Sequence, residues 1–216
     1  MICIIDYGVG NLFSLKSSLA HLGLDAAVSA DPADIRAADR LILPGVGAFG
    51  DAMAKLEATG LVPVIKEEAE KKPLLGICLG MQMMNTYFLV AEEAERRGWD
   101  GPLLALFEQM KKERYMFTEP VDGHWDGHIT RDNVDRFKHP VHVTPGSRLE
   151  RLTGKQTILG ASMHNYRITH PARSLTVAAR TDDGTIEALE YGEQMLGVQF
   201  HPEADDQNDE LFRAIL

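Results

Sequence analysis

The chain has 216 residues, and its composition excludes several classes of protein before any motif is considered. A 44% hydrophobic share with 25% charged residues is typical of a soluble globular protein with a sizeable core. The net charge of −10 argues against a nucleic-acid partner, because phosphates bind basic surfaces. No membrane span and no signal peptide is expected. Two cysteines, Cys3 and Cys78, form no disulfide framework, so we expect a reducing, cytoplasmic location.

The first half of the chain alternates between short apolar runs and helical patterns. Strands are predicted at 2–6, 26–29, 39–43 and 74–77, and helices follow Asn11 and Asp31 and cover about 51–58 and 61–71. Strands separated by helices of this length form a mostly parallel sheet with helices on both faces. Ligands of such sheets bind beyond the carboxyl ends of the strands.

The second half has a different pattern. Residues 90–114 are charged and predicted to be helical, whereas 115–140 have no clear pattern. Short β-rich segments follow at 141–143, 157–160, 174–181, 185–191 and 195–200, with a hairpin turn at 182–184 and a last helix at 209–216. We therefore expect one α/β domain over residues 1–216, flavodoxin-like, with antiparallel strands added to the parallel sheet.

A candidate nucleophile lies where the strand at 74–77 ends. Gly76-Ile77-Cys78-Leu79-Gly80 has the form G-x-C-x-G between an apolar strand and a helical stretch, which is the nucleophile elbow with cysteine in place of serine. The glycines permit the tight turn that such an elbow requires. A helix N-terminus favours the thiolate of Cys78, and the N–H of Leu79 points to where an oxyanion would form.

A candidate base lies at the end of a later apolar strand. In Gly197-Val198-Gln199-Phe200-His201-Pro202-Glu203, His201 follows the strand and Glu203 stands two residues further on. A carboxylate at this spacing can accept a hydrogen bond from the imidazole and fix its tautomer. Alone, a histidine and a glutamate at this spacing are more often surface residues. Together with the elbow they predict a Cys-His-Glu triad.

The two motifs GICLGMQ (76–82) and GVQFHPE (197–203) closely resemble those of the class I glutamine amidotransferases. The resemblance implies hydrolysis of glutamine, with Cys78 as nucleophile, His201 as base and Glu203 as the third member of the triad. It also implies that Gln82 contacts substrate and that Pro44-Gly45-Val46-Gly47 is the oxyanion strand, with Leu79 beside it. No metal and no organic cofactor is needed for this chemistry.

The two halves of the chain resemble different members of that superfamily. IIDYGVGNL (4–12) and LPGVGAFGDAM (43–53) are similar to the glutaminase subunits of imidazole glycerol phosphate synthases, which supply ammonia to a cyclase subunit in histidine biosynthesis. HPVHVTPGSRLERLTG (139–154) and RTDDGTIEALEY (180–191) are similar to γ-glutamyl hydrolases. Three functions follow as hypotheses: an amidotransferase subunit in a heterodimer with a synthase partner, a stand-alone γ-glutamyl hydrolase, or a catalytically silent binding module. The N-terminal motifs and the intact triad favour the first.

Four histidines lie close together in the sequence, at His124, His128, His139 and His142. Zinc would need a compact set of ligands on ordered elements. Because aspartates are interspersed with these histidines, the sequence favours a solvated loop and no metal site.

Overall fold

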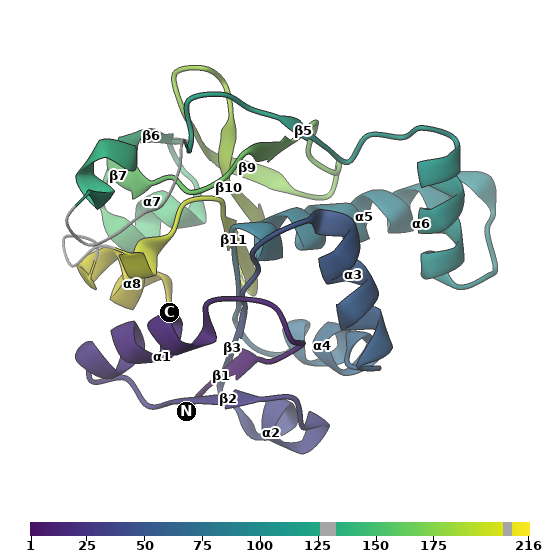
Figure 1. Cartoon of the computed structure of the whole chain (residues 1–216), viewed down its shortest axis with the longest axis horizontal. Helices are drawn as coiled ribbons and strands as arrows, with labels where there is room; N and C mark the ends of the chain where they lie inside the picture. The colour runs from purple at the N-terminus through teal and green to yellow at the C-terminus, as the bar shows by residue number, and fades with distance from the viewer. Residues whose placement is uncertain (126–132, 205–208) are drawn as a thin grey trace.

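The computed structural model describes residues 1–125, 133–204 and 209–216, and Figure 1 shows their arrangement. Strands and helices alternate in the first half of the chain, as predicted. The elements are β1 (Ile2–Ile5), α1 (Leu12–His21), β2 (Ala26–Ser29), α2 (Pro32–Ala37), β3 (Arg40–Leu43), α3 (Phe49–Ala58), α4 (Val62–Ala69), β4 (Leu74–Ile77) and α5 (Leu79–Arg97).

The second half consists mainly of strands. Its described elements are α6 (Leu103–Lys112), β5 (Thr118–Pro120), a 3-10 helix (Val134–Phe137), β6 (Lys138–Val143), α7 (Arg148–Thr153), β7 (Thr157–Ala161), β8 (Tyr166–Ile168), β9 (Thr176–Arg180), β10 (Ile186–Tyr191), β11 (Met195–Val198), a second 3-10 helix (Pro202–Ala204) and α8 (Asp209–Ile215). The hairpin at 182–184 and the last helix therefore lie where the sequence predicts them.

Within the described residues, nine strands form one sheet in the order β2-β1-β3-β4-β11-β10-β9-β6-β7, and β5 pairs separately with β8. The strands from β2 to β11 are parallel, and those from β11 to β7 are antiparallel. The predicted mixed α/β sheet is thus confirmed. Its strand β11 pairs with β4 in parallel and with β10 in antiparallel register, so it joins the two halves.

Side chains of the central parallel strands β1, β4 and β11 are buried on both faces of the sheet, whereas those of the edge strand β2 are half-buried. Ile2 and Ile4 belong to the same apolar cluster as Leu15 of α1, whereas Cys3 and Ile5 belong to the cluster that includes α3 and α5. This alternation follows from the period of two along a strand. Helices consequently cover both faces, and the carboxyl ends of the strands remain as the place for a site.

The charged segment at 90–114 is helical, but it is divided between two helices. Gly98 ends α5 with a left-handed backbone (φ 60°), and its N–H donates to the carbonyl of Ala94. Pro102 then precedes α6 as its N-cap. A left-handed glycine followed by a proline ends one helix and allows a new one to begin. In Figure 1, α6 lies beside the C-terminal part of α5, at the edge of the molecule.

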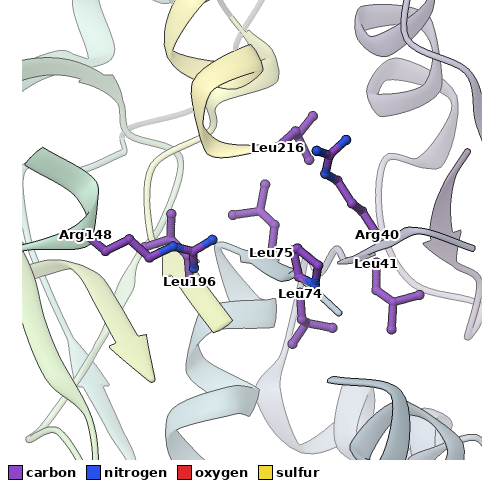
Figure 2. A pocket seen from close by; sticks show the side chains of 8 residues that line it. Arg40, Leu41, Leu74, Leu75, Arg148, Leu196 and Leu216 are labelled. Carbon is purple, nitrogen blue, oxygen red and sulfur yellow. The ribbon is translucent and has the colours of Figure 1, made fainter. Parts of the chain in front are cut away.

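A small cavity lies near the amino ends of β3, β4 and β11. Its volume is about 10 Å³, and Arg40 and Arg148 reach it from opposite sides (Figure 2). That is room for about one water molecule, which excludes an amino-acid substrate. Among the described residues, no helix is both long and apolar enough to cross a membrane.

Candidate active site

Cys78 occupies the turn between β4 and α5 and has a strained backbone. Its φ is 53° and its ψ is −110°, in a region that residues with a side chain rarely adopt. The N–H of Cys78 donates to the carbonyl of Val198 at 2.7 Å, which attaches the turn to β11. The strain thus persists because the neighbouring strand holds the backbone in place. This is the elbow that the sequence predicts, with the thiol at the N-terminus of α5.

Three glycines let α5 approach the sheet closely enough to form this elbow. A Cβ atom at Gly80 would lie 2.0 Å from the carbonyl oxygen of Leu43, and one at Gly197 would lie 2.6 Å from Cγ of Met81. A Cβ at Gly76 would lie 3.0 Å from the backbone of Gly80. Helix α5 therefore touches β3, β4 and β11 directly, and any larger residue at these positions would displace the nucleophile.

The neighbouring strand brings His201 to the same edge of the sheet. Since β11 runs parallel to β4, with Val198 opposite Ile77, the residues that follow the two strands lie side by side. The N–H of His201 donates to the carbonyl of Ala161 at 2.9 Å. Nδ1 of His201 lies 2.8 Å from Oε1 of Glu203. A carboxylate only accepts hydrogen bonds, so Nδ1 carries a proton and Nε2 is left for the thiol.

The protonation of His201 depends on two neighbours. Burial lowers its pKa, but the charges of Glu203 and Cys78, and hydrogen bonds to both, raise the pKa of His201 well above its usual value. The same hydrogen bonds place the side chains of Cys78 and Glu203 on either side of the imidazole. His201 thus lies between a carboxylate and the cysteine sulfur, and both neighbours favour its protonated form.

The loop after β3 packs against the elbow. A Cβ at Gly45 would lie 2.7 Å from Cβ of Leu79, so only glycine fits there without displacing the elbow. The hydroxyl of Tyr7 donates to the carbonyl of Pro44 at 2.7 Å and fixes the start of this loop. Val46 is exposed, and Gly47 has a left-handed backbone (φ 88°). The structure thus packs Gly45 against Leu79 beside Cys78, and the oxyanion role of Gly45, Val46, Gly47 and Leu79 stays a prediction.

Two buried glutamines lie behind Cys78. Nε2 of Gln199 lies 3.4 Å from the sulfur of Cys78, within reach to donate a hydrogen bond to it. Nε2 of Gln82 donates to Oε1 of Gln199 at 3.0 Å and to the carbonyl of Tyr166 at 3.0 Å. Gln82 is thus a buried support of the site, and its contact with substrate stays a prediction. No motif predicts a role for Gln199, although a polar residue in an apolar strand indicates a buried polar contact.

The prediction that the histidines form a solvated loop is wrong for two of them. His124 is buried, and His139 lies on β6 with both ring nitrogens buried. They meet His164 and Glu187 of the antiparallel half, and together these four residues form the histidine–glutamate cluster. The sequence could not indicate this, because the strand order β10-β9-β6 brings the residues together. His142 is exposed and pairs with Asp182, and His128 lies outside the described residues.

A cysteine elbow facing a histidine–glutamate pair, at the ends of parallel strands in an α/β sheet, is the architecture of hydrolases that form an acyl thioester. The sequence profile of the family described as "Glutamine amidotransferase class-I" matches residues 3–212. The chain therefore belongs to the class-I glutamine amidotransferase family, and it is an enzyme of that family.

Curated relatives give a narrower similarity. The chain is 48% identical over 206 residues to the imidazole glycerol phosphate synthase subunit HisH of Symbiobacterium thermophilum, covering 94% of this chain and 86% of the relative. It is 39% identical over 204 residues to the HisH subunit of Moorella thermoacetica, covering 94% and 87%. This similarity continues through the second half, where the motifs had resembled γ-glutamyl hydrolases.

Among solved structures, a glutamine amidotransferase from Thermotoga maritima has the same fold. Its TM-score is 0.58 at 14% identity, and the match covers 98% of this chain and 79% of that one. Another solved glutamine amidotransferase has a TM-score of 0.64 at 18% identity, with 100% of this chain and 97% of that one covered. At these identities the likeness supports the fold alone.

Proposed function

We propose that this chain is the glutaminase subunit of an imidazole glycerol phosphate synthase, supplying ammonia to a cyclase subunit in histidine biosynthesis. Hydrolysis rests on one observation, the hydrogen-bonded line of Cys78, His201 and Glu203 at adjacent strand ends. The destination of the ammonia rests on the HisH relatives, which cover 94% of the chain. We further propose that residues 1–216 act as one domain and that the enzyme is cytoplasmic.

In the proposed mechanism, His201 holds the proton of Cys78 and the thiolate attacks the γ-amide carbon of glutamine. The tetrahedral intermediate collapses as the C–N bond breaks, and Nε2 of His201 donates its proton to the leaving ammonia. Water then attacks the thioester and gives a proton to His201, the C–S bond breaks, and glutamate leaves. Glu203 holds the imidazole in the required tautomer throughout.

The oxyanion of both intermediates requires backbone donors. The N–H of Leu79, the first residue of α5, is one candidate, and an N–H of the segment Gly45–Val46–Gly47 is the other. This segment packs directly against Leu79. We propose that its peptide turns toward the site when the partner subunit binds, which would couple glutamine hydrolysis to the cyclase.

The direct test compares glutamine hydrolysis by the purified chain alone and after mixing with the cyclase subunit from the same source. We expect strong stimulation on mixing, and none when the mixture contains Cys78→Ala. Full activity without the cyclase, with turnover of γ-glutamyl amines, would instead identify a stand-alone γ-glutamyl hydrolase and contradict the proposal.

A further inference from the structure

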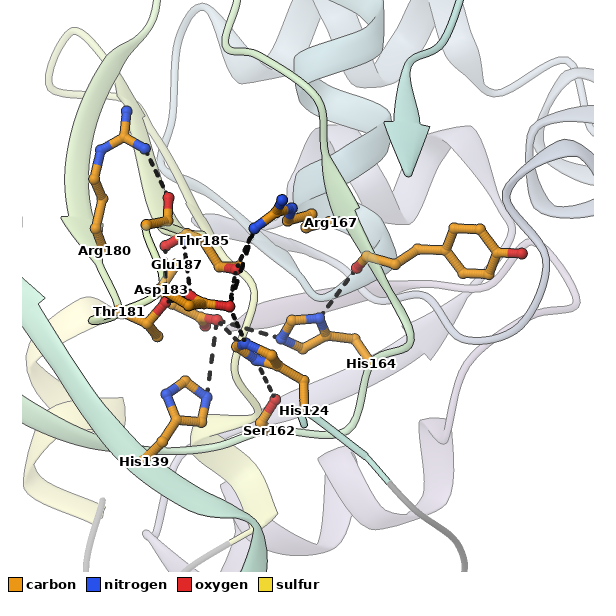
Figure 3. Close-up of polar contacts among 12 residues, drawn as sticks. His124, His139, Ser162, His164, Arg167, Arg180, Thr181, Asp183, Thr185 and Glu187 are labelled. Atoms are coloured by element: carbon orange, nitrogen blue, oxygen red, sulfur yellow. Dashed lines mark hydrogen bonds and ion pairs between the residues drawn. The ribbon is translucent and has the colours of Figure 1, made fainter. Parts of the chain in front are cut away.

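The histidine–glutamate cluster lies in the antiparallel half of the molecule and is separate from the triad. His124 follows β5, His139 lies on β6, His164 precedes β8, and Glu187 lies on β10. Each offers one ligand atom, and the four atoms all lie within 4.8 Å of one another. Figure 3 shows the side chains pointing toward a common centre from these different segments.

Glu187 is fully buried in the middle of the cluster. Its Oε1 lies 3.3 Å from Nε2 of His164, 3.7 Å from Nδ1 of His124 and 3.8 Å from Nε2 of His139. Its Oε2 has no hydrogen-bond partner among the described residues, and the same is true of both ring nitrogens of His139. Within the described part of the chain, no lysine or arginine pairs with Glu187. Buried carboxylates are paired with a positive charge or coordinate a metal, and of the described side chains only imidazoles face Glu187.

Hydrogen bonds outside the cluster fix two of its imidazoles. Nε2 of His124 lies 3.2 Å from Oδ2 of Asp183. Asp183 accepts hydrogen bonds from Thr181 and Thr185, so it is an acceptor toward His124 as well. Nε2 of His124 must then carry the proton. The lone pair of Nδ1 is left facing Oε1 of Glu187 and the hydroxyl of Ser162, which is 3.1 Å away.

His164 is fixed in the same way. Its Nδ1 lies 3.0 Å from the carbonyl of Tyr166, which can only accept, so Nδ1 carries the proton. Nε2 of His164 lies 3.3 Å from Oε1 of Glu187, so it donates a second proton to that carboxylate when no ion is bound, and it offers a lone pair there when an ion displaces that proton. Nδ1 of His124, Nε2 of His164 and Oε1 of Glu187 thus converge on one point. An imidazole that donates outward to a carboxylate or a carbonyl while its other nitrogen faces inward is the usual arrangement of a metal ligand.

We propose that His124, His139, His164 and Glu187 bind one divalent transition-metal ion, with Zn²⁺ as the fitting choice. Three imidazole nitrogens and one carboxylate oxygen form a common tetrahedral donor set for zinc. In such a tetrahedron the donor atoms stand about 3.3 Å apart, so the widest gap in the cluster must close by a rotation of side chains. The ion places positive charge beside Glu187 and joins the segment after β5 to three strands or strand ends of the second half.

A chain of hydrogen bonds connects the proposed metal site to the triad. The carbonyl of Tyr166 accepts from both His164 and Gln82, Gln82 donates to Gln199, and Gln199 faces the sulfur of Cys78. Through His164 and Tyr166, the ion therefore fixes the position of Gln82, and with it Gln199 beside Cys78, without contacting the substrate. Its role is structural, and the site is independent of the proposed ammonia transfer.

The test measures zinc retention by untagged protein with Cys78→Ala in all samples, so that the reactive thiol takes no part. The protein is treated with a chelator, equilibrated with Zn²⁺, dialysed and analysed for metal by mass spectrometry. We expect close to one ion per chain in the parent and little in His139→Gln. His142→Gln is the matched control, because His142 lies on the same strand but faces solvent, and it should retain zinc like the parent.

A graded pair of variants separates ligation from general damage. We expect Asp183→Asn, which replaces the carboxylate facing His124 and leaves the four cluster residues in place, to weaken zinc binding about 10- to 100-fold, and His139→Gln to weaken it further. The ring nitrogens of His139 make no hydrogen bond among the described residues, so we expect its replacement to leave the fold intact, as circular dichroism will check. Cobalt substituted for zinc should give the absorption of a tetrahedral site in the parent and in His142→Gln, but not in His139→Gln. Absence of retained zinc in the parent, or equal retention in His139→Gln and His142→Gln, would overturn the proposal.

Discussion

The triad and the histidine–glutamate cluster show two ways in which one sheet assembles polar groups. The triad comes from two parallel neighbours, β4 and β11, and its residues lie in two short motifs immediately after the strands. The cluster comes from four separate segments of the antiparallel half. Where neighbouring parallel strands end at the same edge, the site residues lie in short motifs directly after the strands, and the sequence can predict them. Antiparallel strands bring together residues with no fixed spacing in the sequence.

We expect the largest loss of activity from a substitution in the triad. Cys78→Ala removes the nucleophile, and we expect glutamine hydrolysis to fall on the order of 10⁴-fold or more, because triad members act as a unit. The thermal midpoint and the zinc content should stay close to those of the parent, since the cluster does not include Cys78. Hydrolysis is measured as glutamate release with the cyclase present. Turnover near that of the parent would show that another group performs the chemistry.

Glu203→Gln should weaken the triad by a smaller amount and change its pH dependence. We expect kcat/KM to fall about 10²- to 10⁴-fold, because the imidazole loses the carboxylate that orients it. Activity requires protonated His201 to release ammonia, so the rate declines as pH rises through the raised pKa of His201. Without the charge of Glu203 that pKa falls, and the decline should begin at lower pH. A pH profile with an unchanged alkaline limb would argue against this role.

Gly80→Ala tests the close packing that positions the nucleophile. Its Cβ would lie 2.0 Å from the carbonyl oxygen of Leu43, so we expect a loss of about 1–3 kcal/mol or more in the free energy of unfolding. Gly50→Ala is the matched control, because nothing lies within 4 Å of its Cβ in α3, and a change below about 1 kcal/mol, on the stabilising side, is expected there. Urea unfolding measures both. Equal stability of the two variants would contradict the packing argument.

The smallest effect concerns the cluster. Removing metal with a chelator should lower the thermal midpoint of the parent by about 2–4 °C for each kcal/mol of binding free energy. His139→Gln should show no such response, while His142→Gln should respond as the parent does. Differential scanning calorimetry of the three proteins, with and without Zn²⁺, gives the comparison. A chelator response that survives His139→Gln would place the metal elsewhere.

The parallel half of the fold could be predicted because its signals are local. Apolar runs of four or five residues, separated by capped helices such as the one after Asn11, define successive strand–helix units. Most strands of the second half were also predicted, but their order was not, because pairing β11 with both β4 and β10 is a long-range choice. The division between α5 and α6 depends on Gly98 and Pro102, which a charged helical pattern conceals.

The candidate site could likewise be predicted only where its residues lie in contiguous motifs. Sequence motifs identify Cys78, His201 and Glu203. The contact of Gln199 with the sulfur of Cys78 depends instead on the orientation of a buried side chain just after β11, which no motif specifies. Glu187 is an acidic residue in the mostly buried strand Ile186–Tyr191, and a buried acidic residue is a local indication of a polar site. Its meaning becomes evident only when the sheet brings His124, His139 and His164 to it.

Active-site labelling tests whether Cys78 attacks the side-chain carbonyl of glutamine. A glutamine analogue that alkylates the attacking thiol is incubated with the chain, which is then digested and analysed by peptide mass spectrometry. We predict one adduct, on the peptide that carries Cys78, formed more slowly when glutamine is in excess. Labelling of Cys3 instead, or no adduct on a folded chain with His201 and Glu203 intact, would contradict the account.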